Sequence, residues 1–329
     1  MAITVLNERE LRDCVGLDME AVQAVADAFT ALAQGGVVMP PIVHLDVPDK
    51  NGEMDVKTAY VPGFDAFALK VSTGFFDNPK KGLPSLSGLM NLIDSDTGRV
   101  RAVLLDNGYL TDVRTAAAGA VAAQHCARTD ARTVGVFGTG LQARLQVEAL
   151  QLVRDVERVL VWGRDADKAE TLASYFRNEV GLDAEARGDA AGVAGESDIV
   201  VTTTPASEPI LQADWLPPGV HVTAMGSDAA GKNEVDPEVF RKADRVVVDK
   251  VEQCRKLGEL RSALAAGTIA EDAEITELGE LTSGLKAVRV DADQITVCDL
   301  TGTGVQDTAI ATVAYRKAVE KGYGTSVDG

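Results

Sequence analysis

The residues best suited to chemistry lie in a glycine-rich stretch near the middle of this 329-residue chain. Gly138, Gly140 and Ala143 form the spacing G-x-G-x-x-A, directly after an apolar run and at the start of a helical stretch. Gly138 permits a tight turn, Gly140 lets the backbone approach a diphosphate, and Ala143 lets the helix pack close to the strand. The N–H groups of a helix N-terminus then bind the anion. The spacing predicts a dinucleotide-binding turn, with a plain glycine turn as the alternative.

The residues after the next apolar run bear on which dinucleotide is bound. An acid at the end of that strand would bind the ribose 2′-hydroxyl of NAD(H), whereas an Arg would accept the 2′-phosphate of NADP(H). Arg164 favours NADP, and Asp165 keeps NAD open. Arg164 is equally typical of a solvated surface charge.

Three basic side chains in the first part of the chain could bind a substrate. Lys70 lies near the end of the apolar run 66–71, where it either reaches water or points into a site, and Lys57 is a similar but weaker case. Arg114, near the start of a predicted helix, could bind a carboxylate. A salt bridge from Arg114 to Asp112 or a neighbouring loop, and surface positions for the lysines, are the alternatives.

Asp228 and His44 are the candidate proton-transfer groups. Asp228 follows a predicted strand at 221–225, and ligands of open α/β sheets bind beyond the carboxyl ends of strands. There it could exchange a proton with a substrate nitrogen, or simply belong to a Gly-Ser-Asp turn. His44 lies in a Pro-rich region and is a candidate acid or substrate contact, or an ordinary strand histidine. No Ser/His/Asp arrangement and no G-x-S-x-G motif stands out.

Composition and sequence pattern argue against several kinds of partner and site. The net charge of −18 disfavours nucleic acid and anionic lipid as partners. The four cysteines are far apart, without a CxxC pair, and only three histidines occur, so no metal site and no disulfide framework is expected. No apolar run of about 18 residues and no secretory leader is evident, so we expect a cytoplasmic protein that does not enter a membrane.

The middle and end of the chain alternate short apolar runs with helical stretches. Such near-continuous runs are typical of strands buried on both faces of a parallel sheet covered by helices. The stretches 141–153 and 166–180 have helical spacing. The six predicted strands are 133–137, 158–162, 198–203, 221–225, 245–248 and 295–299. Together they predict a doubly wound α/β sheet.

The first 110 residues have a different pattern. An amphipathic helix is expected at 19–34, and dense Pro and Gly residues then separate short apolar runs. Those runs predict an antiparallel or mixed sheet, with strands at 56–61, 66–72, 87–93 and 100–105.

Two further helices are expected outside these runs. Thr111 is predicted to cap a helix that ends near Ala127, and Asp307 to cap a helix that ends near Lys321. The tail from Gly322 is expected to be loose.

Over nearly its whole length the chain resembles the ornithine cyclodeaminase/μ-crystallin family. The stretches that match are 81–84, 96–98, 110–117, 138–143 and 299–302, the last followed by Asp307. Within the family, the stretches 57–63, 75–79, 225–228 and 232–234 resemble the ectoine-utilisation branch, which is also similar to imine reductases such as iminosuccinate reductase.

The resemblance implies a Rossmann dinucleotide-binding domain at 119–304. It also implies an N-terminal α+β domain for substrate binding and dimerisation, formed by 1–118 with 305–329, and a homodimer. The residues implied to bind NAD(H) or NADP(H) are Gly138, Thr139, Gly140, Leu141, Gln142, Arg164, Thr203, Thr204, Pro205, Thr301 and Gly302.

The resemblance also assigns roles to the charged candidates. Lys70 and Arg114 match the positions that hold the substrate carboxylate and the reacting group, and Asp228 matches the proton-transferring acid. Ornithine-cyclising members have an Arg where this chain carries His44, and a Glu near residues 57–59 that is not evident here. Both departures argue against ornithine as the substrate.

The sequence therefore predicts an NAD(P)H-dependent imine reductase for a small α-imino acid, such as iminosuccinate or a cyclic imine. Arg114 and Lys70 would anchor the α-carboxylate, Lys57 would suit a second carboxylate, and Asp228 would move the proton. An ammonia-releasing cyclodeaminase with bound NAD, an amino acid dehydrogenase and a non-catalytic ligand-binding protein are the alternatives.

Overall fold

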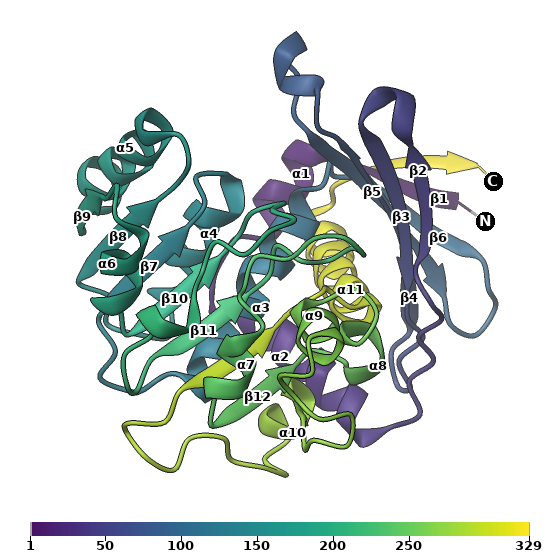
Figure 1. Ribbon diagram of the computed structural model, residues 1–329. Helices are drawn as coiled ribbons and strands as arrows, with labels where there is room; N and C mark the ends of the chain where they lie inside the picture. The colour runs from purple at the N-terminus through teal and green to yellow at the C-terminus, as the bar shows by residue number, and fades with distance from the viewer. Residues whose placement is uncertain (1, 329) are drawn as a thin grey trace. The chain divides into compact units, whose positions relative to one another are not determined.

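Two units make up the part of the chain that the computed structural model describes, residues 2–328. The first comprises Met1–Thr115 with Thr303–Gly329 and is called here the mixed-sheet unit. The second comprises Ala116–Gly302 and is called the parallel-sheet unit. Figure 1 labels the elements of both.

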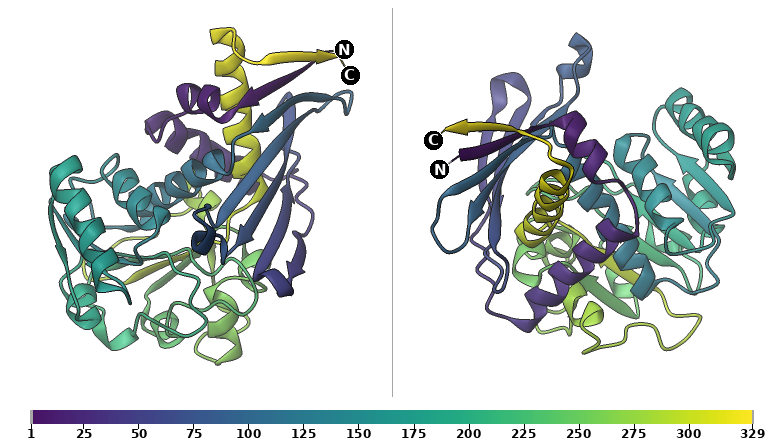
Figure 2. Two further views of the ribbon diagram at one scale, coloured as in Figure 1. Left: turned by 90° about the horizontal axis from the view of Figure 1, so that it is seen from above. Right: turned by 180° about the vertical axis from the view of Figure 1, so that it is seen from behind.

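The mixed-sheet unit contains a seven-stranded sheet in the order β15-β1-β6-β5-β4-β3-β2. Its neighbouring strands are antiparallel except for the parallel pair β1 and β6. The strands are β1 (Ala2–Asn7), β2 (Val43–Val47), β3 (Gly52–Thr58), β4 (Ala66–Phe75), β5 (Leu86–Asp94), β6 (Val100–Leu105) and β15 (Thr325–Asp328). The mixed sheet is thus confirmed. The expected loose tail is wrong, because β15 pairs with β1, as both views in Figure 2 show.

Helices α1 (Glu8–Cys14), α2 (Met19–Gln34) and α11 (Gly304–Lys321) complete this unit. The bounds predicted for α2 are confirmed. One face of the sheet supplies Ala68, Met90 and Leu104 to a core that also contains Ile310 and Ala314 of α11. Because strand side chains alternate between faces, α11 covers the face to which these residues point. Figure 1 shows α11, in yellow, beside β4.

Helix α3 (Tyr109–Cys126) begins earlier than expected. The carboxylate of Asp106, just ahead of it, accepts a hydrogen bond from Leu110 N at 2.8 Å, which satisfies an amide of the first turn. Thr111 is therefore the third residue of the helix and not its cap. The error also moves Arg114 out of the first turn, since it is the sixth residue of α3.

The cap predicted for α11 is also wrong. Thr303 is the N-cap, and it forms a capping box with Gln306, whose Oε1 accepts from Thr303 N at 2.7 Å. Asp307 is the fourth residue of the helix and points inward, with 0% of its surface exposed.

The parallel-sheet unit contains eight strands in the order β13-β12-β14-β11-β10-β7-β8-β9, and every neighbouring pair is parallel. The strands are β7 (Thr133–Phe137), β8 (Arg158–Trp162), β9 (Asp183–Ala186), β10 (Ile199–Thr202), β11 (His221–Ala224), β12 (Arg245–Val248), β13 (Thr276–Glu277) and β14 (Thr296–Asp299). All six predicted strands are present within a residue or two.

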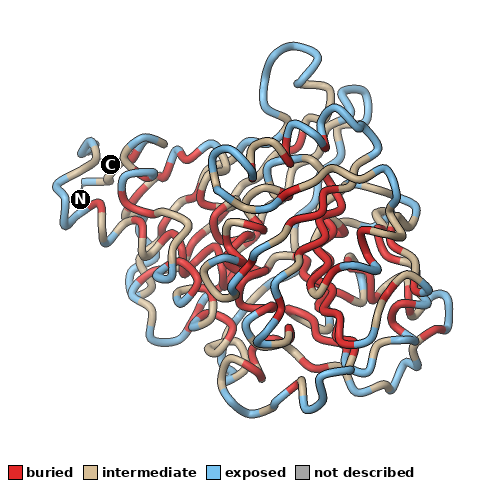
Figure 3. The backbone as a smooth tube through the Cα atoms, turned by 90° about the vertical axis from the view of Figure 1, so that its left-hand side faces the viewer, coloured by how far each residue is buried: buried red, intermediate tan, exposed pale blue. Residues whose placement is uncertain are grey.

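Helices lie between these strands along the chain. They are α4 (Leu141–Leu150), α5 (Ala166–Tyr175), α6 (Ala190–Gly195), α7 (Glu238–Lys242), α8 (Val251–Cys254), α9 (Glu259–Ala265) and α10 (Leu278–Thr282). Separate apolar clusters cover the two faces of the sheet: Val134 and Val201 belong to one cluster, and Val200 and Val222 to the other. Burial on both faces explains the continuous apolar runs of the strands and confirms the doubly wound α/β class. Figure 3 shows buried and exposed backbone along the chain.

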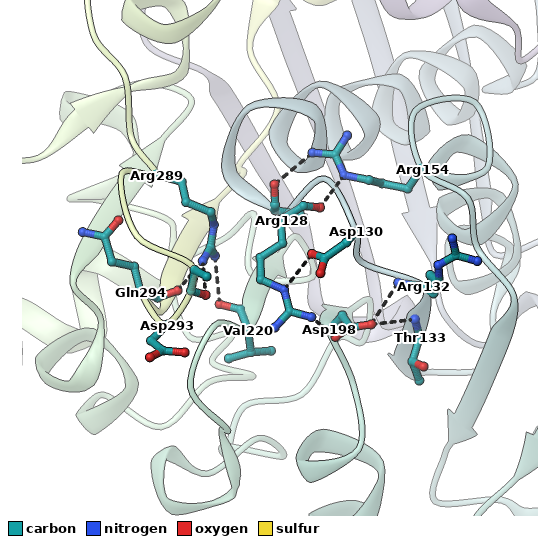
Figure 4. A network of polar contacts seen from close by, with 12 residues as sticks. Arg128, Asp130, Arg132, Thr133, Arg154, Asp198, Val220, Arg289, Asp293 and Gln294 are labelled. Atoms are coloured by element: carbon teal, nitrogen blue, oxygen red, sulfur yellow. Dashed lines mark hydrogen bonds and ion pairs between the residues drawn. The ribbon is translucent and has the colours of Figure 1, made fainter.

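The end of α3 is held by an arginine that has no acidic partner among residues 2–328. Arg154 donates to the carbonyl oxygens of Ala123, Ala127 and Arg128 at 2.7–2.9 Å, so it satisfies acceptors that a helix C-terminus leaves open. Arg128 in turn donates to Asp198 at 2.7 Å, and Figure 4 shows this network. Within residues 2–328 no helix combines the length and the apolar character needed to span a bilayer.

Candidate active site

Two lysines meet on one face of the mixed sheet because of strand register. Lys57 of β3 lies opposite Lys70 of β4, which lies opposite Met90 of β5. Residues directly opposite one another project from the same face. Lys57 is 6% exposed and Lys70 is 2% exposed, so both ammonium groups are withdrawn from water.

Asp307 joins the basic residues from α11. Its Oδ2 lies 3.1 Å from Lys70 Nζ, and its Oδ1 lies 2.8 Å from Arg114 Nε. Arg114 thus pairs with Asp307 and not with Asp112, the partner that the local sequence suggested. We call Lys57, Lys70, Arg114 and Asp307 the basic cluster.

The role of Asp307 was missed from the sequence, although a signal for it exists. Ala311, Ala314 and Ala318 are buried at helical spacing along α11, and Asp307 continues that stripe one turn earlier. An acidic residue on the buried face of a helix needs a partner inside the protein, because burying an unpaired charge costs free energy. The predicted N-cap role concealed this pattern.

Burial and neighbouring charges shift the pKa values in the basic cluster. Burial, reinforced by the like charge of Arg114, lowers the pKa of Lys70 to about 7. Burial by itself would raise the pKa of Asp307, but the neighbouring cations Arg114 and Lys70 hold it below its usual value. Burial raises the pKa of the nearby Asp106. Arg114, Lys70 and Lys57 thus all act on the carboxylate of Asp307, and an anionic ligand would be attracted by the same three cations.

His44 lies on the same sheet face, at the edge. It is opposite Asp55, and Asp55 is two residues from Lys57 along β3, so the three side chains project to one side. His44 Nδ1 is 2.7 Å from Asp55 and its Nε2 is 3.1 Å from Asp46, with the side chain 38% exposed. The hydrogen bond to Asp55 raises the pKa of His44. A substrate contact for His44 stays a prediction.

The predicted dinucleotide turn lies between β7 and α4. Gly138 has φ +133°, and a Cβ there would lie 2.4 Å from Thr203 Oγ1, so only glycine fits. Gly140 is the N-cap of α4, and a Cβ there would meet nothing within 4 Å. Its backbone therefore borders open space that a diphosphate could enter, next to the first amides of the helix.

The other residues of the turn occupy the expected positions. Leu141, 50% exposed, and Gln142 open α4, whereas Ala143 is fully buried between helix and strand. Thr139 lies against Gly163 at the end of β8, and Arg164 is exposed just beyond. The residues present thus suit a dinucleotide, because there is open space beside Gly140 and, in the part of the chain that the structure describes, no side chain caps the N-terminus of α4.

The loops that follow β10 and β11 are joined by a buried acid, Glu234. Its carboxylate accepts hydrogen bonds from the amide of Thr204, from Gly226 N at 2.7 Å and from Thr202 Oγ1 at 2.9 Å. Burial raises the pKa of Glu234 to about 7. Glu234 thereby fixes the loop that contains Thr203, Thr204 and Pro205 against the loop that leads to Asp228.

Asp228 lies four residues beyond the end of β11 and is partly exposed. Lys232 Nζ is 2.6 Å from its Oδ1, and the side chains are 41% and 17% exposed for Asp228 and Lys232. Asp228 therefore lies beyond the carboxyl end of a parallel strand, where ligands of such sheets bind. Its part in proton transfer stays a prediction.

The loop after β14 is held in a similar way. Asp249, fully buried, accepts from Thr301 N at 2.8 Å and from Gly302 N at 2.7 Å. The candidate cofactor residues thus all follow the carboxyl ends of parallel strands, and they lie at one edge of the sheet. Among residues 2–328, no three His, Cys, Asp or Glu side chains are grouped as metal ligands.

Comparison with known proteins extends over the whole chain. Residues 4–322 match the ornithine cyclodeaminase/mu-crystallin family. An uncharacterized cyclodeaminase of Sinorhizobium fredii is 55% identical, with 98% of this chain and 97% of the relative covered.

Three solved structures are also similar. An archaeal alanine dehydrogenase dimer with bound NAD is 35% identical, with TM-score 0.92 and 100% and 99% of the two chains covered. The Thermococcus litoralis Δ1-pyrroline-2-carboxylate reductase, in complex with NADH and L-proline, is 30% identical, with TM-score 0.93 and coverage of 99% and 100%. The iminosuccinate reductase of Paracoccus denitrificans, in complex with NAD+, is 30% identical, with TM-score 0.91 and complete coverage of both chains.

These findings confirm the resemblance and the fold. Relatives include reductases of imino acids, an amino acid dehydrogenase and cyclodeaminases. The chain belongs to the ornithine cyclodeaminase/mu-crystallin family, whose members are NAD(P)-dependent oxidoreductases or cyclodeaminases that act on imine or amino groups.

Proposed function

We propose that this protein is an NAD(P)H-dependent reductase that converts a small α-imino acid into the amino acid. The observation that carries the proposal is the basic cluster, in which three buried basic side chains act on one carboxylate, that of Asp307. The same three cations attract an anionic substrate. The parallel-sheet unit is proposed as the cofactor-binding domain, and the mixed-sheet unit as the substrate and dimerisation domain.

The basic cluster suits a substrate with two carboxylates. Arg114 and Lys70 bind the α-carboxylate in the proposal, and Asp307 holds both cations in place. Lys57, opposite Lys70 in the sheet, binds a second carboxylate. A dicarboxylic imino acid, such as iminosuccinate, is therefore the favoured substrate, and a cyclic imino acid with one carboxylate is second.

The reaction adds a hydride and a proton across a C=N bond. Bound NADH or NADPH supplies the hydride at its nicotinamide C4. The carboxylate of Asp228, held by Lys232 at 2.6 Å, stabilises the protonated imine nitrogen, and after hydride addition at carbon it passes a proton from solvent to the amine that forms. Arg114 and Lys70 keep the imine carbon oriented, so that positioning and electrostatics provide most of the acceleration.

The test is a screen of α-keto acids with ammonia, followed by the oxidation of NADH and NADPH in parallel. We expect oxidation that requires both keto acid and ammonia, with oxaloacetate at least about tenfold better than pyruvate in kcat/KM, because Lys57 meets the second carboxylate. Arg114→Met should lower kcat/KM by about 10²-fold or more, and the exposed Arg99→Met should leave it unchanged. Absence of turnover with every imine would refute the proposal.

A cyclodeaminase is the second candidate, favoured by the 55% identity to the Sinorhizobium relative. Such an enzyme releases ammonia from a diamino acid with no net change in nicotinamide absorbance. We therefore expect no ammonia from ornithine or lysine. Ammonia release without net oxidation or reduction of the cofactor would replace the reductase by this second candidate.

A homodimer in the cytoplasm completes the proposal. The solved archaeal alanine dehydrogenase is a dimer, and β2 of this chain is an edge strand that exposes Val43 and Leu45. Exposed apolar side chains on an edge strand suit a second copy of the chain. Light scattering coupled to gel filtration should give the mass of a dimer, and Leu45→Lys should lower that mass, whereas a monomeric wild type would contradict this part.

A further inference from the structure

The segment after β8 lies directly beside the dinucleotide turn. Phe137 of β7 is opposite Trp162 of β8, and Gly138 N donates to Trp162 O at 2.9 Å. In a doubly wound sheet, the end of this second strand meets the adenosine ribose of the cofactor. Gly163, Arg164 and Asp165 are therefore the residues that face the 2′ position of that ribose.

An acidic side chain at Gly163 would have to displace the side chain of Thr139. A Cβ on this residue would lie 2.5 Å from Thr139 Cγ2, closer than real Cβ contacts come. Its φ is not positive, so the side chain of Thr139 and not the backbone conformation disfavours a larger residue here. This chain thus has no Asp or Glu at the position that would bind a ribose 2′-hydroxyl, and Thr139 occupies the space beside it.

The carboxylate of Asp165 is already engaged. Asp165 is the N-cap of α5, its Oδ1 accepts from Lys168 N at 3.2 Å, and its Oδ2 lies 3.6 Å from Lys168 Nζ. An N-cap interaction of this kind stabilises a helix by about 1 kcal/mol. Asp165 would have to give up this interaction in order to bind a ribose.

Arg164 provides the opposite chemistry. Its side chain is exposed, and within residues 2–328 no hydrogen bond or ion pair is recorded for its guanidinium. Lys168, the third residue of α5, is 71% exposed. A guanidinium with an ammonium nearby, at the start of a ten-residue helix, suits a phosphate monoester and offers a 2′-hydroxyl no acceptor.

We propose that this protein selects NADP(H) over NAD(H). Arg164 binds the 2′-phosphate, Asp165 is held as the N-cap of α5, and Gly163 supplies no acid for a 2′-hydroxyl. The inference rests on the proposed function for the location of the cofactor. The proposed preference for NADP(H) differs from the three solved relatives, whose structures contain NAD, NADH or NAD+.

The test measures binding and not turnover, so it does not depend on knowing the imine. Titration calorimetry compares NADPH with NADH, and 2′,5′-ADP with 5′-AMP. We expect wild type to bind NADPH at least about tenfold more tightly than NADH, because charge-assisted hydrogen bonds to the phosphate add to the shared contacts. 2′,5′-ADP should likewise bind more tightly than 5′-AMP.

Variants separate a phosphate site from general surface charge. Arg164→Ala should weaken NADPH binding by about 10- to 100-fold and leave NADH unchanged. Arg241→Ala, an exposed arginine on α7, should change neither. The double variant Gly163→Asp with Thr139→Ala should favour NADH, since it supplies both the acid and the space for it.

Each result decides between distinct readings. Equal or tighter binding of NADH by wild type, or an equal loss of both nucleotides in Arg164→Ala, overturns this inference and leaves an NADH-dependent reductase intact. Failure of both nucleotides to bind overturns the cofactor site and the proposed function together.

Discussion

Removing the acid of the basic cluster should destabilise the protein more than removing one of its bases. Asp307 is fully buried between Lys70 at 3.1 Å and Arg114 at 2.8 Å. Asp307→Asn leaves three buried cations without their shared counter-ion. Breaking a buried ion pair in this way costs about 3–5 kcal/mol.

Lys70→Met acts in the opposite sense. It removes a buried ammonium group, whose pKa is already lowered to about 7, and it removes the repulsion between Lys70 and Arg114. Asp307 keeps Arg114 as a partner, and methionine fills a similar apolar volume. We therefore expect the free energy of unfolding of this variant to lie within about 1 kcal/mol of wild type.

Thermal unfolding of the ligand-free protein measures both effects. For a domain of roughly 150 residues, each kcal/mol changes Tm by about 2–4 °C, so Asp307→Asn should unfold about 6–20 °C lower than wild type. Lys70→Met should stay within about 4 °C of wild type although it loses activity. Asp130→Asn, which removes a largely exposed partner of Arg128, is the matched control and should change little.

The order of the two variants tests the charge argument. If Lys70→Met were the less stable variant, or if Asp307→Asn were as stable as wild type, Asp307 would not be the counter-ion on which the buried cations depend. The anion-binding role of the basic cluster would then lose its physical basis.

Three further predictions concern pH, the loops and the fold. Since the pKa of Lys70 is about 7, binding of succinate should take up a proton and weaken up to about tenfold per pH unit between about pH 7 and 9. Lys70→Arg should abolish this slope in calorimetry, and an unchanged slope would exclude the lysine as its source. Glu234→Gln places an amide against backbone donors, so hydrogen exchange should accelerate at Thr204 and Gly226, and nucleotide affinity should fall about tenfold. Unaltered exchange would show that the carboxylate does not hold the loops. Arg154→Met leaves carbonyls at the end of α3 without donors and should cost about 3 kcal/mol in thermal unfolding, whereas a loss below about 1 kcal/mol would contradict the capping role.

The sequence predicted the parallel sheet well because both faces of its central strands are buried, which gives continuous apolar runs. It missed β9 and β13 for physical reasons. β9 reads Asp-Ala-Glu-Ala at the sheet edge, and β13 is only two residues long. Edge strands often carry polar residues and lack an apolar run. Such strands can be identified only from the strand with which they pair, not from their own composition.

The candidate site was predicted in part. Lys70, Arg114 and the Gly138 turn were recognised by type and spacing, but the partners that fix them were not. Asp307 was mistaken for a cap because short polar residues before a helix are typical caps. Glu234 was not singled out, because the three groups that donate to it become neighbours only when β10 and β11 pair. A tertiary contact of this kind leaves no local pattern in the sequence.

The position of Asp307 near the end of the chain has a consequence for biosynthesis. The parallel-sheet unit is contiguous, Ala116–Gly302, so it can fold on the ribosome as soon as its own residues have emerged. The mixed-sheet unit must wait longer, since α11 and β15 follow the whole parallel-sheet unit in the chain. Until then Lys70 and Arg114 lack Asp307, and the nascent chain cannot form the basic cluster. Activity should therefore require the emergence of α11, and a ribosome stalled before residue 303 should carry a folded parallel-sheet unit without activity.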